Sequence, residues 1–215
     1  MLRPHILAAV ASSALVATAC GGNHDAAHDS GVESCPIGDL ASAVELEIVN
    51  LDANGQVIQT QDMAQVPLVV PPQGGWAVAL GARARNIDCR LTLKTALTDL
   101  CTSRILATDS RDTHLDLGAD GWGLTTLNSF SALQVCSVPA AVRDTNDVPY
   151  SITVSIADSG GYKASKSITV VPTCPTDGAN ATCCAVQCND AYSLGDPCDM
   201  APPTVHQTCP PAAAP

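Results

Sequence analysis

The residues of this 215-residue chain whose chemistry is easiest to define are its 11 cysteines. A cysteine can form a disulfide, bind a metal ion or act as a nucleophile, and its spacing from other cysteines helps to distinguish these roles. No two of the cysteines form a Cys-x-x-Cys pair, which zinc sites commonly use. The spacing therefore favours disulfides, and disulfides require an oxidising compartment.

The first twenty residues are typical of a secretory signal. Arg3 precedes an apolar run from Ile6 to Ala17, which is too short for a permanent transmembrane helix, and small residues lead to Cys20. The residues before Cys20 resemble the lipobox of bacterial lipoproteins, although Ala17 stands where the commonest form has leucine. This resemblance implies cleavage before Cys20 and a lipid anchor, including palmitate, on that residue. The alternative is an ordinary cleaved signal, after which Cys20 pairs with another cysteine.

Setting Cys20 aside leaves an even number of cysteines, as a fully disulfide-bonded exported protein would have. The ten disulfide candidates are Cys35, Cys89, Cys101, Cys136, Cys174, Cys183, Cys184, Cys188, Cys198 and Cys209. The adjacent Cys183 and Cys184 are expected to take different partners, because a disulfide between neighbouring residues is strained. The sequence does not rank the possible disulfide connectivities. Even if the four cysteines of residues 35–171 pair separately from the six of residues 172–215, the four allow three arrangements and the six allow fifteen.

The lipoprotein resemblance also implies a location. Several acyl chains would hold the protein on a membrane without a transmembrane helix. Gly21 follows Cys20, where an aspartate would mark retention in the inner membrane of enteric bacteria. We therefore expect a protein of the bacterial cell envelope, anchored to the outer membrane at its periplasmic face or at the cell surface.

Composition divides the chain into four segments. Residues 1–19 form the signal peptide, and residues 20–34 form the lipidated cysteine and a flexible tether of small polar residues. Residues 35–171 carry nearly all the strand patterns. Residues 172–215 contain eight of the 15 prolines and six of the ten disulfide candidates, so this tail is expected to have little regular structure.

The apolar residues of segment 35–171 recur with a period of two, which predicts strands. Val44, Leu46 and Ile48 alternate with glutamates, and the clearest hairpin runs from Tyr150 through a turn at 158–161 to residue 171. Aromatic residues make up only 3% of the chain, so the core must consist of aliphatic side chains. We expect an all-β fold, an antiparallel β-sandwich of about eight strands.

The last hairpin resembles the final two strands of immunoglobulin-like sandwiches of the cadherin and fibronectin type III kind. The alternation from Tyr150 to Ile156, followed by the turn Asp158-Ser-Gly-Gly161, carries this resemblance. The whole layout is also similar to surface lipoproteins of myxobacteria-like organisms. These resemblances imply an immunoglobulin-like sandwich and a surface location.

Two groups of residues have the types found in metal sites. Asp144-Thr-Asn-Asp147 resembles the calcium-binding linker of cadherins, since carboxylate and amide oxygens suit that cation, but one such loop supplies too few ligands. His24 and His28 have the spacing of a transition-metal pair on a helix, but no third ligand is evident. We predict no metal site and no cofactor.

The sequence contains none of the short motifs that mark common enzyme classes, such as Gly-x-Ser-x-Gly or His-Glu-x-x-His. A net charge of −11 argues against nucleic acid as a partner. We expect a non-enzymatic envelope lipoprotein, without catalytic residues, that has a binding or structural role and a protein or glycan partner. The alternatives are a calcium-dependent adhesion module and a protease inhibitor that uses the cysteine-rich tail.

Overall fold

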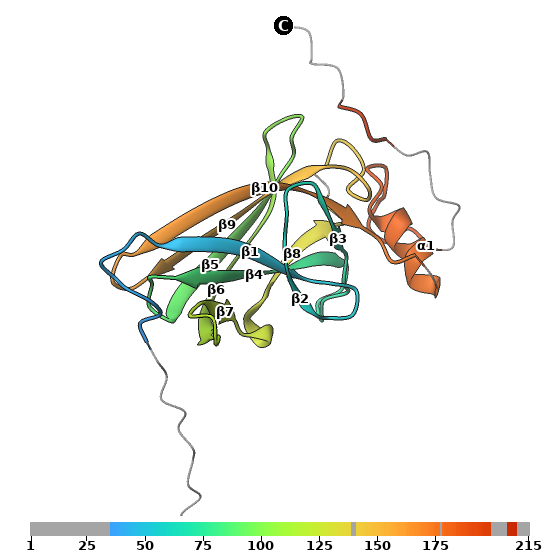
Figure 1. Ribbon diagram of the computed structural model, residues 1–215. Coiled ribbons are helices and arrows are strands. Elements are labelled where there is room, and N and C mark those ends of the chain that lie inside the picture. The colour runs from blue at the N-terminus through green and yellow to red at the C-terminus, as the bar shows by residue number, and fades with distance from the viewer. Residues whose placement is uncertain (1–34, 139–140, 177, 199–205, 210–215) are drawn as a thin grey trace, which may run out of the picture. The chain divides into compact units, whose positions relative to one another are not determined.

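The computed structural model describes residues 35–138, 141–176, 178–198 and 206–209 (Figure 1). The predicted signal peptide, the lipidation site Cys20, the tether and the histidine pair lie outside these residues. The strands are β1 (Glu45–Leu51), β2 (Val57–Gln59), β3 (Ala64–Pro67), β4 (Trp76–Arg85), β5 (Arg90–Thr98), β6 (Ile105–Leu117), β7 (Gly123–Thr125), β8 (Ser131–Cys136), β9 (Tyr150–Asp158) and β10 (Lys163–Thr173). A 3-10 helix, η1 (Leu127–Ser129), and an α-helix, α1 (Gly178–Gln187), complete the described elements.

The strands form one mixed sheet in the order β2-β1-β4-β7-β6-β5-β9-β10-β3, with β8 paired to β4. The all-β prediction is therefore confirmed. The prediction of a purely antiparallel arrangement is wrong in one place, because β3 runs parallel to β10, with Ala64 opposite Val170. This pair joins segments more than one hundred residues apart, and local periodicity carries no information on such pairing.

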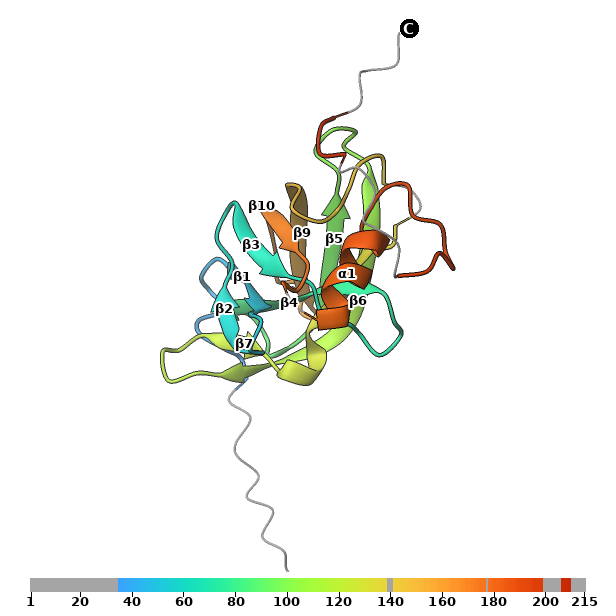
Figure 2. The same cartoon turned by 90° about the vertical axis from the view of Figure 1, so that its right-hand side faces the viewer.

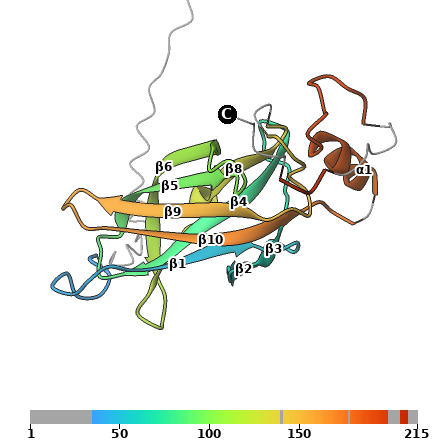
Figure 3. The same cartoon turned by 90° about the horizontal axis from the view of Figure 1, so that it is seen from above.

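Strand β6 connects two halves of the sheet. Its residues from Ile105 to His114 pair with β5, whereas its last residues, from Leu115 to Leu117, pair with β7. We call β2, β1, β4, β7 and β8 the first half and β5, β9, β10 and β3, with most of β6, the second half. Figure 3 shows β6, β5, β9 and β10 side by side in this order.

The predicted alternation is present in the second half and buries one of its faces, whereas β4 of the first half is buried on both faces, because Val49, Ala79 and Phe130 form a second small cluster. In β9, Tyr150, Ile152, Val154 and Ile156 are all at most 1% exposed, whereas Ser151 and the other intervening residues are more exposed. Each half therefore presents an aliphatic face to one common core.

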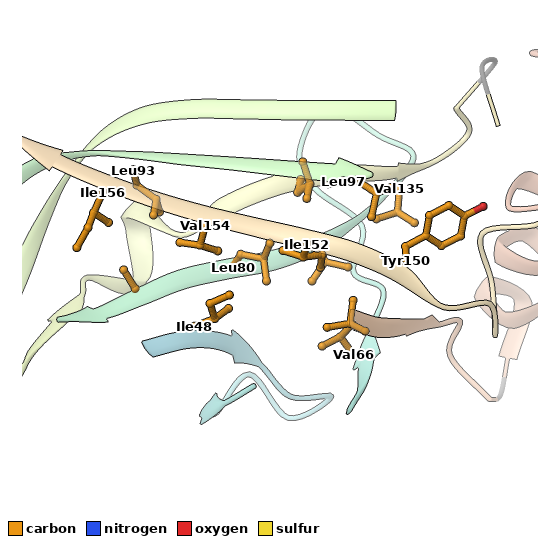
Figure 4. Close-up of a cluster of buried hydrophobic side chains, with 14 of the residues drawn as sticks. Ile48, Val66, Leu80, Leu93, Leu97, Val135, Tyr150, Ile152, Val154 and Ile156 are labelled. Carbon is orange, nitrogen blue, oxygen red and sulfur yellow. The ribbon is translucent and has the colours of Figure 1, made fainter. Parts of the chain in front are cut away.

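The core contains side chains from both halves (Figure 4). Ile48 from β1 and Leu80 from β4 belong to the same cluster as Leu93 from β5 and Ile152 from β9. Leu, Ile and Val dominate this cluster, as the scarcity of aromatic residues predicts. Tyr150 is the largest of its fully buried side chains.

The C-terminal segment differs from the prediction, because it contains helix α1. The helix lies beyond one end of the strands in two perpendicular views (Figures 1 and 3), and it lies in front of the strands in Figure 2, which faces that end. Cys184 and Cys188 are four positions apart, so they lie on one side of a helical turn, and both are buried in the core cluster. Trp76 Nε1 also donates a 2.8 Å hydrogen bond to Gln187 Oε1. Contact with the body of the protein therefore stabilises regular structure in a proline-rich segment.

Candidate functional site

The outer face of the second half carries mainly polar side chains, and we call it the hydroxyl face. Side chains alternate along each strand, so every second residue of four neighbouring strands points away from the core. The hydroxyl face consists of Thr108, Ser110, Asp112 and His114 of β6, Arg90, Thr92, Lys94 and Ala96 of β5, Thr153, Ser155 and Ala157 of β9, and Lys163, Ser165 and Ser167 of β10.

The strand register places Lys94 at the centre of this face. Lys94 is opposite Ser110 of β6 on one side and Ser155 of β9 on the other, and Ser155 is opposite Ser165 of β10. The Ser155 and Ser165 hydroxyl groups are 2.7 Å apart, within hydrogen-bond distance. Lys94 therefore has a small hydroxyl side chain directly opposite it on each neighbouring strand.

Other hydroxyl groups on the face are also connected across strands. The Thr153 and Ser167 hydroxyls lie 2.7 Å apart, and Thr92 Oγ1 donates to Asp112 Oδ1 over 3.0 Å. Each such hydroxyl keeps acceptor capacity for a further partner. The face thus presents a regular set of short polar groups.

Three open hollows lie along the hydroxyl face. Their volumes are about 770, 430 and 300 Å³. Lys94 lines all three, while Thr92 and Ala157 are shared by the first two and Ser155 by the last two. Because adjacent hollows share residues, they form one depression that crosses the four strands through Lys94.

Two lysines on the face have no charged partner. Lys94 and Lys163 are both exposed, and no carboxylate of the described residues pairs with either ammonium group. Several arginines elsewhere are paired: Arg83 with Glu47, and Arg85 with Glu45. The hydroxyl face therefore carries positive charge that the protein itself does not neutralise.

His114 lies at one end of the first hollow. Its Nε2 atom is 3.9 Å from Asp116 Oδ1, too far for a hydrogen bond. Asp112 and Ser129 also line this hollow. The hollow is an open depression on a sheet surface and is not a deep pocket.

All ten disulfide candidates lie in five pairs at disulfide distance. The pairs are Cys35–Cys89, Cys101–Cys209, Cys136–Cys188, Cys174–Cys184 and Cys183–Cys198. The adjacent Cys183 and Cys184 have different partners, as the strain argument predicts. Two of the pairs, Cys101–Cys209 and Cys136–Cys188, join the tail to segment 35–171, so the cysteines of the two segments do not pair separately.

Two groups of potential metal ligands occur in the described part of the chain. One contains Cys174, Cys184 and Cys188, and the other contains Cys35, Asp88 and Cys89. Every cysteine in both groups belongs to a disulfide, and a disulfide sulfur is not the thiolate that binds metals. Neither group therefore forms a metal site while these disulfides are intact.

The calcium-like loop at 144–147 has a structural role. Asp144 is buried, and its Oδ1 atom accepts hydrogen bonds from Asn189 Nδ2 at 2.9 Å and from the Asp190 backbone N–H at 3.1 Å. Its Oδ2 atom accepts a 2.7 Å bond from the backbone N–H of His206. Both oxygens of Asp144 are thus used to hold the tail, which leaves them poorly placed to bind a cation.

The structure also contains a buried ion pair that the sequence did not reveal. Arg143 Nε donates to Asp99 Oδ1 over 2.8 Å, and their side chains are only 5% and 1% exposed. The guanidinium group lies 4.5 Å from the ring centroid of Tyr150. Tyr150 in turn donates from its hydroxyl to the backbone oxygen of Asp144 at 3.0 Å.

The pKa values of this cluster follow from its surroundings. Burial opposes ionisation of Asp99, but hydrogen bonds from Thr102 and the Cys101 backbone, together with Arg143, outweigh it and hold the pKa of Asp99 below its ordinary value. Burial raises the pKa of Tyr150 well above its ordinary value. Both groups therefore stay in the forms that their hydrogen bonds require at neutral pH.

Comparison of the chain with family models, curated proteins and solved structures finds no match. None of the helices in the described ranges has the length and apolar character needed to cross a membrane.

Proposed function

We propose that the protein is a non-enzymatic lipoprotein of the bacterial cell envelope that binds a ligand through its hydroxyl face. The position of Lys94 carries this proposal: an exposed cation without a charged partner lines all three hollows of one open depression. An unpaired ammonium group among hydroxyls is suited to binding and offers little to folding. The depression has the form of a recognition surface for an extended partner.

The disulfides support the export and anchoring part of the proposal. Ten of the 11 cysteines are in pairs, so Cys20 has no partner among the cysteines of the described residues. Its place after the apolar run and small residues fits a cysteine that receives a lipid. We place the mature protein on the outer membrane, with the acyl chains as its membrane contact.

The strand arrangement supports an immunoglobulin-like sandwich as the fold of segment 35–171. The first half contains the order β1-β4-β8, and the second half contains β6-β5-β9-β10-β3. Tyr150 opens β9, and its hydroxyl bonds to backbone oxygens six and seven residues upstream, at Asp144 and Arg143. A tyrosine at this place with this bond is a hallmark of such sandwiches.

Footprinting of lysines tests the proposed function on the native full-length protein. The chain has only three lysines, Lys94, Lys163 and Lys166, so mass spectrometry can follow each one separately. Lys166 pairs with the buried Val154 in the strand register, so it points to the other face of β10 and serves as an internal control. The protein, purified in detergent, is acetylated with and without an extract of the cell envelope.

We expect the extract to reduce acetylation of Lys94 and Lys163 and to leave Lys166 unchanged. Equal labelling of all three lysines with and without extract would contradict binding at the hydroxyl face. The intact mass in the same experiment reports the anchor, since the proposal requires an acylated Cys20 and no free thiol. An unmodified mature protein would contradict the lipoprotein assignment.

A further inference from the structure

We propose that the ligand of the hydroxyl face is an acidic polysaccharide that bears carboxylate groups. This inference rests on the proposed function, because it names the chemical class of the partner for the same surface. The evidence comes from the positions of the two unpaired lysines, from the groups around them and from the charge of the whole chain.

The two lysines are placed to contact separate points of one extended chain. Lys94 and Lys163 both line the hollow of about 430 Å³. Lys94 lies on β5 and Lys163 on β10, with β9 between them, and Lys163 pairs with Ala157, two residues beyond the Ser155 that faces Lys94. Ordinary strand spacing and rise then put their Cα atoms about 12 Å apart. A polymer with repeated negative charges can meet both ammonium groups at once.

The groups between the lysines suit a sugar better than a protein. Ser155 and Ser165 lie in the same hollow as the lysines, and Thr153 lies in the adjoining one. Hydroxyl groups can both donate to and accept from the hydroxyls of a sugar. Protein interfaces depend on buried Trp, Tyr or other large anchors, and none of the residues that define the hydroxyl face is Phe, Trp or Tyr.

Charge selects an acidic polysaccharide over a neutral one. The whole chain has a net charge of −11, so a polyanion is repelled except where the protein has local positive charge. Lys94 and Lys163 provide that charge, and each can pair with a carboxylate. Asp112 on the same face limits the total positive charge, which disfavours the dense phosphates of nucleic acid.

Binding measurements with defined polymers test this inference. The full-length protein in detergent is titrated with polygalacturonate, which carries carboxylates on a sugar chain, and with dextran, a neutral sugar chain. Polyglutamate, a carboxylate-bearing polypeptide, and single-stranded DNA are the other two probes. We expect polygalacturonate to bind at least about tenfold more tightly than each of the others, a difference of about 1.4 kcal/mol.

Charge-reversal variants identify the surface. Lys94→Glu and Lys163→Glu are each expected to weaken polygalacturonate binding by about tenfold or more, whereas Lys166→Glu makes the same change in net charge and is expected to alter it less than about twofold. All three side chains are exposed, and equal thermal midpoints would show that the variants fold alike. Raising the salt from about 0.1 to 1 M shortens the screening length from about 10 to 3 Å and should weaken the wild-type interaction.

Several outcomes would overturn the inference. Equal weakening by Lys166→Glu would show a general charge effect, and dextran binding as tightly as polygalacturonate would exclude carboxylate recognition. Tighter binding of polyglutamate or DNA would assign the face to an acidic protein or to nucleic acid. If envelope extract protects Lys94 from acetylation while polygalacturonate fails to bind, the proposed binding function stands and only the ligand class is wrong.

Discussion

Replacement of Arg143 by methionine tests whether the buried ion pair holds the end of the sheet where the tail is attached. Asp99 is 1% exposed, and in the variant its carboxylate would lose the 2.8 Å bond from Arg143 Nε. Removing one partner of a buried pair costs about 3–5 kcal/mol. Asp99 would keep hydrogen bonds from Cys101 N and from Thr102, so the expected loss lies near the lower limit, about 3 kcal/mol.

Thermal unfolding with the disulfides intact measures this loss. For a domain of this size each kcal/mol lowers the midpoint by about 2–4 °C, so Arg143→Met should unfold about 6–12 °C below the wild type at neutral pH. Arg85→Met is the control, because Arg85 pairs with Glu45 on the surface, where the two side chains are 42% and 45% exposed. Such exposed pairs contribute less than about 1 kcal/mol.

The pH dependence provides a second readout. The pKa of Asp99 is lowered in the folded protein, so its ionised form stabilises the fold above the pKa of the unfolded chain, and this contribution disappears as the pH falls through the folded value. In Arg143→Met the unpaired Asp99 protonates more easily. The gap between variant and wild type should therefore narrow below about pH 4. If Arg143→Met unfolds no earlier than Arg85→Met at neutral pH, the ion pair does not stabilise this end of the sheet.

Two further substitutions probe packing and the tail. A Cβ added at Gly123 would lie 2.9 Å from Leu115 Cβ and still closer to Ile37 Cδ1. Gly123→Ala should therefore lower the free energy of unfolding by about 1–3 kcal/mol. An unchanged thermal midpoint would contradict this close packing. The disulfide Cys101–Cys209 has a sequence separation of 108 residues. Replacing both cysteines with serine should lower the free energy of unfolding by at most about 4.7 kcal/mol. The same change should expose the tail to proteases. An unchanged midpoint together with an unchanged cleavage pattern would show that this link does not hold the tail.

The strands were predictable where their signal is local. The alternation in β9 requires one buried face. The turn at 158–161 ends at Gly161, whose φ angle is +89°, and it allows the chain to return as β10. Strand β3 gives a weak signal because it has four residues, of which only Val66 is fully buried, and it ends at Pro67. Its parallel partner lies far along the chain.

Helix α1 was missed because its stability comes from contacts outside the helix. The spacing of its cysteines favours disulfides over a metal site, but the four-residue interval between Cys184 and Cys188 also fits one face of a helix. That face packs on the core, and the Cys136–Cys188 disulfide attaches it to the end of β8. Tertiary contact thus overrides the composition of a segment rich in proline.

The candidate binding face was only partly predictable. Arg90, Thr92 and Lys94 alternate with buried leucines, so the sequence places them on the outer side of a strand. Such residues ordinarily do no more than contact water. Their neighbours are determined by the order β6-β5-β9-β10, and only this order brings Lys94 and Lys163 to one depression. Sequence alone therefore identifies the face of a strand and not the site.

Four arginines of the described residues pair with a carboxylate, whereas none of the three lysines does. Arg83, Arg85, Arg111 and Arg143 each pair with a carboxylate, and the planar guanidinium group suits fixed partners of this kind. The chain has 21 acidic residues against ten basic ones, so carboxylates are abundant. Lys94 nevertheless has no carboxylate partner among the described residues. In the proposed complex, a carboxylate of the ligand supplies the partner that Lys94 lacks.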